Sequence, residues 1–277
     1  AYDITCRDWS SDVGSSDLDR GLLYGDGLFE TLRLHNGQPL RWDQHFDRLR
    51  LGTEFLGIEL PQSQADLRIA AARLAELNRT STALLRLTLT RGVGPRGYSS
   101  AQATRPTLLM TLHPAPPVDP QTPPCWHLVT STRIRLSPDE PLTRFKTCNR
   151  LPYILARQEA DAAGADDALI LNTRGEVAET SAANIFRLRH GHLETPPLQS
   201  GALPGITRAT VLSLARDLGL PTCERAMGPD ELFAADAVFL TMTSLGLVEA
   251  ISLDRRPFAR SPLIASLCAT YWQRTQT

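Results

Sequence analysis

A run of prolines divides this chain, and it limits the possible folds more than any other feature. Six prolines fall between His113 and Pro124. Proline fixes φ and lacks a backbone N–H, so this stretch can continue neither a helix nor a central strand. We therefore interpret 113–125 as a stiff linker. It would join a smaller domain at 19–112 to a larger one at 126–277.

The first of these domains has three strand patterns and two helix patterns. Residues 29–34, 85–90 and 107–112 alternate or cluster apolar residues as strands do. A helix is predicted at 43–57, with Asp43 as its cap and Gly57 as its stop, and a second at 63–77. A glycine-rich loop with two arginines follows the middle strand, at 91–99.

The second domain alternates strands and helices along its length. Strands are predicted at 127–132, 168–171, 183–188 and 237–243. Helices are predicted at 151–163, 205–218 and 261–272. The whole chain is therefore expected to be an α+β protein of two domains.

The composition argues against several classes of function. The net charge is −1 and the pI is about 6.7, so bulk electrostatics favour neither nucleic acid nor an anionic membrane. No apolar run approaches the roughly 20 residues of a membrane span. The five cysteines are scattered and lack CxxC spacing, which favours free thiols in the cytoplasm and no structural metal site.

The first 18 residues differ from the rest of the chain. They are rich in Ser and Asp, have no apolar period and resemble translated sequencing-adapter DNA. We interpret 1–18 as a non-native or flexible arm and leave it out of the fold prediction.

The chain has a single lysine, Lys146, and the other 28 of its 29 basic Lys and Arg residues are arginine. A guanidinium does not lose its proton in a protein, whereas Schiff-base chemistry requires a neutral amine. The lysine therefore suggests a carbonyl-binding residue, with pyridoxal 5'-phosphate as the carbonyl compound that fits. On this residue alone, a chance surface lysine is an equal alternative.

Three further features fit a phosphorylated cofactor. The turn at 203–208 leads into a helix N-terminus, where free N–H groups and the Thr207 hydroxyl favour phosphate. Glu179 precedes an apolar strand and would keep a pyridine nitrogen protonated. Arg48 on the first helix offers a bidentate phosphate clamp. Taken singly, each is more often a plain helix cap, a solvated glutamate or an exposed arginine.

Together these segments resemble the class IV aminotransferase family, the fold type IV pyridoxal-phosphate enzymes. That family includes branched-chain and D-amino-acid transaminases, (R)-selective amine transaminases and aminodeoxychorismate lyase. The resemblance covers about 19–258 and implies a small N-terminal α/β domain, a larger domain with a mixed, barrel-like sheet, and a homodimer. The segments that carry it are 24–27, 45–49, 146–151, 179–186 and 203–208.

The resemblance also implies residue roles. Lys146 matches the Schiff-base lysine and proton shuttle, Glu179 the partner of the pyridine nitrogen, and Leu203 the side chain packed on the cofactor ring. One departure is Leu151, because branched-chain enzymes have a tyrosine five residues after the lysine. The implied phosphate ligands are Arg48, Ile206, Thr207 and Thr243. The implied substrate-binding residues are Tyr24, Thr31, Arg96 and Tyr98.

The motifs leave two reactions open. Segments 96–99 and 149–151 look like aminodeoxychorismate lyase, which forms p-aminobenzoate and pyruvate, whereas 203–208 and 241–244 look more like transaminases. Arg96-Gly97-Tyr98 stands where D-amino-acid transaminases have an Arg-x-His carboxylate trap. We interpret the chain as a transaminase acting on an amino donor and a keto acceptor, with the lyase as the alternative. A cofactor-free aldolase or a pure binding module would leave the phosphate features unused.

Overall fold

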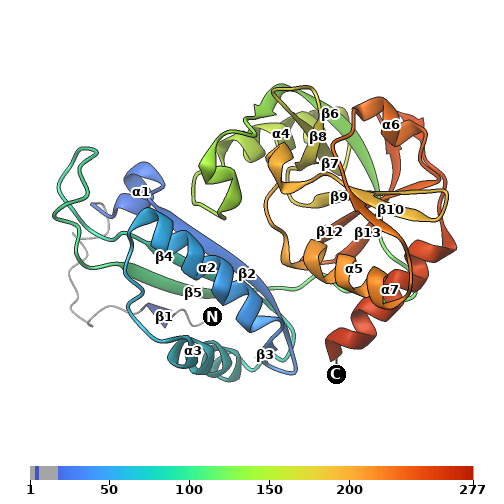
Figure 1. Ribbon diagram of the computed structural model, residues 1–277. Helices are drawn as coiled ribbons and strands as arrows, with labels where there is room; N and C mark the ends of the chain where they lie inside the picture. The colour runs from blue at the N-terminus through green and yellow to red at the C-terminus, as the bar shows by residue number, and fades with distance from the viewer. Residues whose placement is uncertain (1–3, 6–17, 277) are drawn as a thin grey trace. The chain divides into compact units, whose positions relative to one another are not determined.

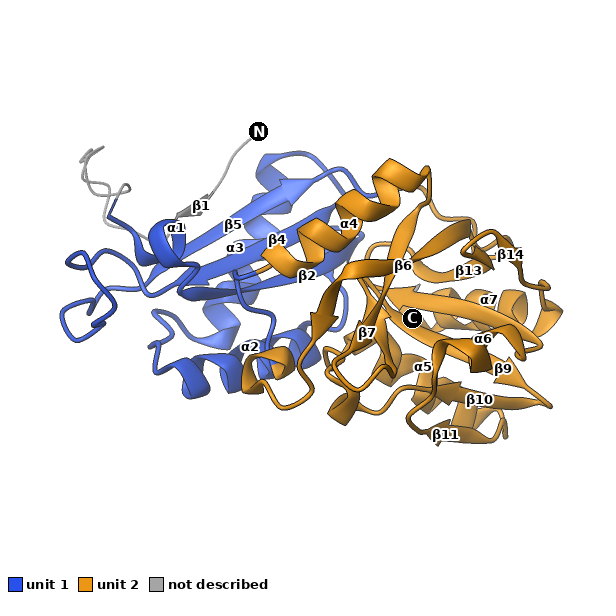
Figure 2. Cartoon of the chain, turned by 90° about the horizontal axis from the view of Figure 1, so that it is seen from above, with its two compact units in different colours: residues 1–115, 145–149 blue, residues 116–144, 150–277 orange. Residues whose placement is uncertain are grey.

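The computed structural model describes residues 4–5 and 18–276, so most of the expected arm at 1–18 lies outside the described residues. The chain forms two compact units (Figure 2). Unit 1 comprises residues 1–115 and 145–149, and unit 2 comprises residues 116–144 and 150–277. The proline-rich stretch at 114–124 has neither helix nor strand, and it contains the first boundary.

Unit 1 is an antiparallel sheet with helices on one face (Figure 1). After the short α1 (Arg20–Tyr24), α2 (Trp42–Leu56) and α3 (Gln64–Leu77) supply that helical layer. The strand order is β1 (Ile4–Thr5), β5 (Thr107–His113), β4 (Leu84–Thr90), β2 (Gly27–His35) and β3 (Gln38–Pro39).

The core of unit 1 follows from the alternation in its strands. Leu85, Leu87 and Leu89 of β4 are buried, while the residues between them are only partly covered. These leucines pack with apolar side chains of α2 and α3. The predicted cap of α2 is wrong: the helix begins after Arg41, whose φ is 52° and which makes no side-chain cap. Asp43 lies instead in the first turn, where its charge suits the helix dipole.

Unit 2 is built on a mixed sheet of nine strands. Three pairings are parallel (β10 with β11, β13 with β6, and β6 with β7) and the remaining ones are antiparallel. The strand order is β11 (Thr222–Glu224), β10 (His192–Thr195), β9 (Asn184–Arg189), β12 (Ala237–Met242), β13 (Gly246–Leu253), β6 (Cys125–Leu136), β7 (Asp167–Asn172) and β8 (Val177–Thr180), with β14 (Arg256–Pro257) paired to β13.

Helices cover the central strands of this sheet (Figure 1). α5 (Ile206–Asp217) and α7 (Pro262–Gln276) pack around the stacked rings of Phe186 and Phe239. Every residue of β12 is buried, as expected for a strand covered on both faces. The remaining helical elements are α4 (Leu151–Ala163), α6 (Pro229–Phe233), η2 (Pro141–Arg144) and η3 (Leu198–Ser200).

The expected α+β fold class is confirmed, and the larger unit has the expected mixed sheet. Among the described residues, no helix is both long and apolar enough to cross a membrane. The segment 145–149 differs from the predicted division, which placed it with 126–277. It groups with unit 1 because its backbone pairs with the start of β2.

Candidate active site

Lys146 is held by unit 1 through its own backbone. The Phe29 N–H donates to the Lys146 carbonyl (2.8 Å), and the Cys148 N–H donates to the Gly27 carbonyl (2.8 Å). The lysine Nζ lies 4.6 Å from the centre of the Phe29 ring. A Cβ on Gly27 would come within 2.6 Å of the Leu89 carbonyl oxygen, so only glycine lets the strands approach here. The lysine is therefore fixed at the start of β2.

Arg48 belongs to a buried cluster in the same unit. Its Nε and Nη2 donate to the two carboxylate oxygens of Glu30, at 2.7 and 2.6 Å. His45 Nδ1 lies 2.7 Å from Glu30 Oε2, and Glu30 is 2% exposed. The fork geometry of this pair fixes the guanidinium plane on α2.

The surroundings of Glu30 and His45 determine the protonation state of each side chain. Burial alone would raise the pKa of Glu30, but the Arg48 charge and the hydrogen bonds from Arg48 and His45 lower it to about 2. Burial lowers the pKa of His45, and the charges of Arg48 and Lys146 act in the same direction. At neutral pH we therefore assign a carboxylate at Glu30 and a neutral imidazole at His45 that donates its Nδ1 proton.

The expected substrate-binding residues all lie in unit 1, in two places. Thr31 is half-buried on β2, opposite Arg86 of β4. Tyr24 ends α1, and its hydroxyl accepts from the backbone N–H of Gly97 in the glycine-rich loop (2.8 Å). Arg96 and Tyr98 flank that glycine and are exposed.

A second buried carboxylate, Glu179, lies near the end of β8 in unit 2 and is held by hydrogen bonds. The Tyr153 hydroxyl donates to its Oε1 (2.9 Å), while the Asn184 amide (3.2 Å) and the Leu203 N–H (3.0 Å) donate to its Oε2. Glu179 is 4% exposed. Burial and the adjacent Glu179 charge raise the pKa of Tyr153, so this phenol stays protonated and keeps donating.

The same cluster reaches the N-terminus of α5. Asn184 also donates to the Leu203 carbonyl (2.9 Å), and a Cβ on Gly205 would come within 1.9 Å of the Asn184 Oδ1. Gly205 is the N-cap of α5 and supplies no side-chain cap. The first N–H groups of the helix, from Ile206 and Thr207, therefore start directly beside the turn that holds Glu179.

Near this helix, Thr241 is a buried hydroxyl on β12 whose Oγ1 has no hydrogen-bond partner within the described residues. Thr243 follows in the turn after β12. An uncapped helix start and an unsatisfied hydroxyl are donors of the kind that a phosphate accepts from. A carboxylate fixed by three donors suits a protonated pyridine nitrogen. The residues of unit 2 therefore fit a pyridoxal phosphate.

Sequence reasoning missed four members of these clusters: Glu30, His45, Tyr153 and Asn184. Tyr153 and Asn184 stand inside segments that drew attention for other residues, and their polar side chains at buried positions were the available signal. Leu151, the departure from branched-chain enzymes, begins α4 and is 63% exposed.

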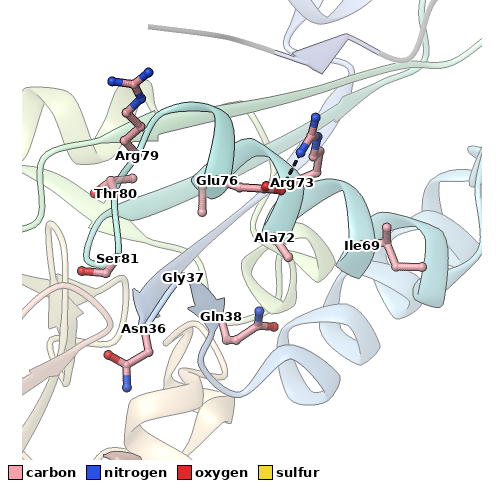
Figure 3. Close-up of a pocket in the computed structure, with 11 residues that line it drawn as sticks. Asn36, Gly37, Gln38, Ile69, Ala72, Arg73, Glu76, Arg79, Thr80 and Ser81 are labelled. Carbon is pink, nitrogen blue, oxygen red and sulfur yellow. Dashed lines mark hydrogen bonds and ion pairs between the residues drawn. The ribbon is translucent and has the colours of Figure 1, made fainter.

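An open groove also occurs in unit 1, and it contains none of the expected site residues (Figure 3). The β2–β3 turn and one side of α3 line it, including the Arg73–Glu76 ion pair at 2.6 Å. We assign no function to this groove.

Comparison with known proteins identifies the family. The sequence profile described as amino-transferase class IV matches residues 27–253, and the chain belongs to the class IV aminotransferase family. Its members are enzymes that use pyridoxal phosphate, which confirms the enzyme class and cofactor expected from the sequence.

Three similar proteins illustrate the range of this family. A Methanocaldococcus jannaschii protein named "Putative branched-chain-amino-acid aminotransferase" is 33% identical over 88% of this chain and 84% of its own. The D-alanine aminotransferase of Bacillus licheniformis is 30% identical over 85% and 82%. The crystal structure of 4-amino-4-deoxychorismate lyase from Pseudomonas aeruginosa has a TM-score of 0.85 at 29% identity and covers 100% of both chains.

Proposed function

We propose that this protein is an aminotransferase that moves an amino group from an amino acid or amine to a keto acid, with Lys146 as its catalytic residue. The observation that carries the proposal is the Glu179 cluster. Tyr153, Asn184 and the Leu203 N–H hold that carboxylate next to an uncapped helix start. A pyridine partner and a phosphate site thus occur together, which is what pyridoxal phosphate requires.

In this proposal Lys146, Glu179 and Leu203 have different chemical roles. Lys146 would bond to the cofactor through its neutral amine, and it would remove and return the substrate Cα proton once substrate displaces it. The Phe29 ring beneath its Nζ orients the amine. Pyridoxal phosphate, when bound, supplies an aldehyde and an electron-accepting ring. Glu179 would hold the proton on the pyridine nitrogen, and Leu203 would pack on the ring.

The phosphate would be bound by side chains and by backbone. Arg48, held flat by Glu30, is the charged ligand. The α5 N-terminus adds N–H groups and the positive end of its dipole. The proposed phosphate ligands are Arg48, the backbone N–H of Ile206, and the hydroxyls of Thr207 and Thr243.

Substrate recognition is proposed for unit 1. Arg96 can bind a substrate carboxylate by charge-assisted hydrogen bonds, and the Tyr98 hydroxyl can add another. Tyr24 and Thr31 are the other proposed substrate-binding residues. We further propose that the enzyme is a cytoplasmic homodimer without a nucleic-acid partner.

The lyase reaction is the second candidate. It is supported by the likeness to the Pseudomonas aeruginosa lyase and by a Bacillus subtilis aminodeoxychorismate lyase that is 28% identical over 88% of this chain. The Arg96–Ser99 segment, which looks like that of lyases, points the same way. Both reactions begin with proton removal by Lys146, so the choice depends on the substrate pocket.

A single-turnover absorbance experiment separates the candidates. The enzyme loaded with pyridoxal phosphate is mixed in turn with D-amino acids, L-amino acids and a chiral amine, without a keto acceptor. We expect one donor class to convert the bound cofactor rapidly to its pyridoxamine form. If every donor leaves the spectrum unchanged and aminodeoxychorismate releases pyruvate, the lyase is the correct assignment.

A further inference from the structure

One buried arginine fixes the loop that carries Arg96 and Tyr98. Arg20 lies on α1 and is 3% exposed. Its Nη1 donates to the carbonyl oxygens of Gly97 (2.8 Å) and Ser99 (3.1 Å), and its Nη2 donates to that of Tyr98 (3.1 Å). Three consecutive carbonyls of the loop therefore converge on one guanidinium.

The guanidinium is itself anchored to the body of unit 1. Its Nε donates to Asp26 Oδ2 (2.9 Å), and Arg91 Nε donates to the same oxygen (2.7 Å). Arg91 continues to the end of α2, where it donates to the carbonyls of Leu56 (2.7 Å) and Gly57 (2.9 Å). Burial raises the pKa of Asp26, but the hydrogen bonds and charges of Arg91 and Arg20 lower it by more. The pKa is therefore below its ordinary value and the carboxylate is charged.

Tyr24 completes the attachment from the other side of the loop. Its hydroxyl accepts from the Gly97 N–H (2.8 Å), and the centre of its ring lies 4.9 Å from the Arg20 guanidinium. The centres of the Tyr24 and Tyr98 rings are 5.9 Å apart in an edge-to-face arrangement. Gly97 has φ 111°, a conformation that favours glycine. The loop shape is thus imposed by Arg20 and Tyr24, while Tyr98 stays 91% exposed.

We propose that Arg20 is a positioning residue that sets the enzyme's preference for carboxylate-bearing substrates. This inference rests on the proposed role of Arg96 and Tyr98 in binding the substrate carboxylate. The described bonds from the Arg20 side chain to this loop go to backbone carbonyls and not to the side chains of Arg96 or Tyr98, so Arg20 would act by holding both side chains in one arrangement before substrate arrives. A preorganised site avoids the ordering cost that a mobile loop incurs on binding.

The sharpest variant is Arg20→Lys. A lysine keeps a cation beside Asp26, but its compact ammonium cannot bond three carbonyls as the planar fork does. Arg20→Met removes the cation as well and serves as the second variant if the first folds poorly. Arg50→Lys is the matched control, because Arg50 is exposed on α2 and pairs only with Asp47 and Glu54 of the same helix in the described structure.

The first readout is limited trypsin digestion of the loaded enzyme, with cleavage after Arg96 followed by mass spectrometry. We expect Arg20→Lys to be cut there about tenfold faster, because several hydrogen bonds that close the loop are lost. Arg50→Lys should be cut at the wild-type rate. Equal rates in Arg20→Lys and wild type would overturn the inference and leave the proposed function standing.

The second readout is donor preference. For a carboxylate-bearing donor, we expect Arg20→Lys to raise KM about tenfold with little change in kcat, and to leave a donor amine without a carboxylate unaffected. Arg96→Ala should give the same pattern, and the double variant should be less impaired than two independent losses would make it. If Arg96→Ala does not change the preference, the proposed carboxylate role of the loop fails and the inference fails with it.

Discussion

Two of the buried carboxylates, Glu30 in unit 1 and Glu179 in unit 2, have different hydrogen-bond partners. Glu30 in unit 1 meets a guanidinium and an imidazole. Glu179 in unit 2 receives its described hydrogen bonds from a phenol, an amide and a backbone N–H, none of which carries a formal charge. The first carboxylate is matched by a cation of the protein itself. The three described bonds to the second come from neutral groups and fix the orientation of its carboxylate.

The two glutamates therefore have different proposed roles. Glu30 binds Arg48 with both carboxylate oxygens and so fixes the plane of a proposed phosphate ligand. In the proposed function Glu179 would pair directly with the pyridine nitrogen, so its charge would take part in the chemistry. Replacing the two carboxylates separately should therefore have different effects.

The largest effect is expected at Lys146, the proposed Schiff-base residue. Lys146→Ala should lower turnover by about 10⁴-fold or more, because the proton shuttle is lost. Lys146→Arg should be equally inactive, since it keeps the charge but offers no neutral amine. Thermal unfolding should show that both variants stay folded, and substantial activity in either would contradict the Schiff-base role.

Glu179→Gln should come next, with a loss of about 100-fold in the rate of Cα proton removal. The amide keeps the shape of the cluster but cannot stabilise a protonated pyridine as a carboxylate does. Cofactor affinity, measured by absorbance titration, should fall less than the rate. Equal kcat in variant and wild type would remove Glu179 from the chemistry and end the contrast with Glu30.

Glu30 should instead affect how the free energy of unfolding depends on pH. Its pKa of about 2 in the folded protein lies below its ordinary 4.5, so its stabilisation is complete above about pH 4.5 and is lost as pH falls towards 2. A shift of that size corresponds to on the order of 3 kcal/mol. The lowered pKa of buried His45 begins the loss earlier, as pH falls below about 6.5.

Urea unfolding of the whole chain at several pH values measures this loss. Glu30→Gln should be less stable at pH 7, because Arg48 loses its partner, and it should lose less stability between pH 5 and 3 than wild type does. An identical slope in wild type and variant would show that the acid sensitivity comes from other carboxylates.

The smallest effect is expected for Tyr153→Phe, which removes a single donor from Glu179. We expect a loss of about 1 kcal/mol, or roughly fivefold in rate, with a shifted absorbance spectrum of the bound cofactor. Tyr271→Phe, in the core of unit 2, is the control for losing a phenol hydroxyl elsewhere. A Tyr153→Phe enzyme with unchanged rate and spectrum would make that hydrogen bond structural only.

The sequence predicted the elements well where a local pattern was enough. The helix at 63–77 and the stop at Gly57 depend on neighbouring residues, and the structure has both. Asp43 failed as a cap because Arg41, in a left-handed conformation, occupies the cap position two residues earlier. The residues proposed for the site are predicted through family resemblance. The bonds from Tyr153 to Glu179 and from Arg20 to Gly97 join positions 26 and 77 residues apart, which no local pattern encodes.

The pairing of Lys146 with β2 limits how the gene can be divided or recombined. The chain passes from one unit to the other three times, after residues 115, 144 and 149. A gene fragment ending in the proline-rich stretch would therefore encode unit 1 without its lysine. Any shuffled or permuted version must carry the short segment 145–149 along with the first 115 residues, or it will separate Lys146 from the strand that holds it.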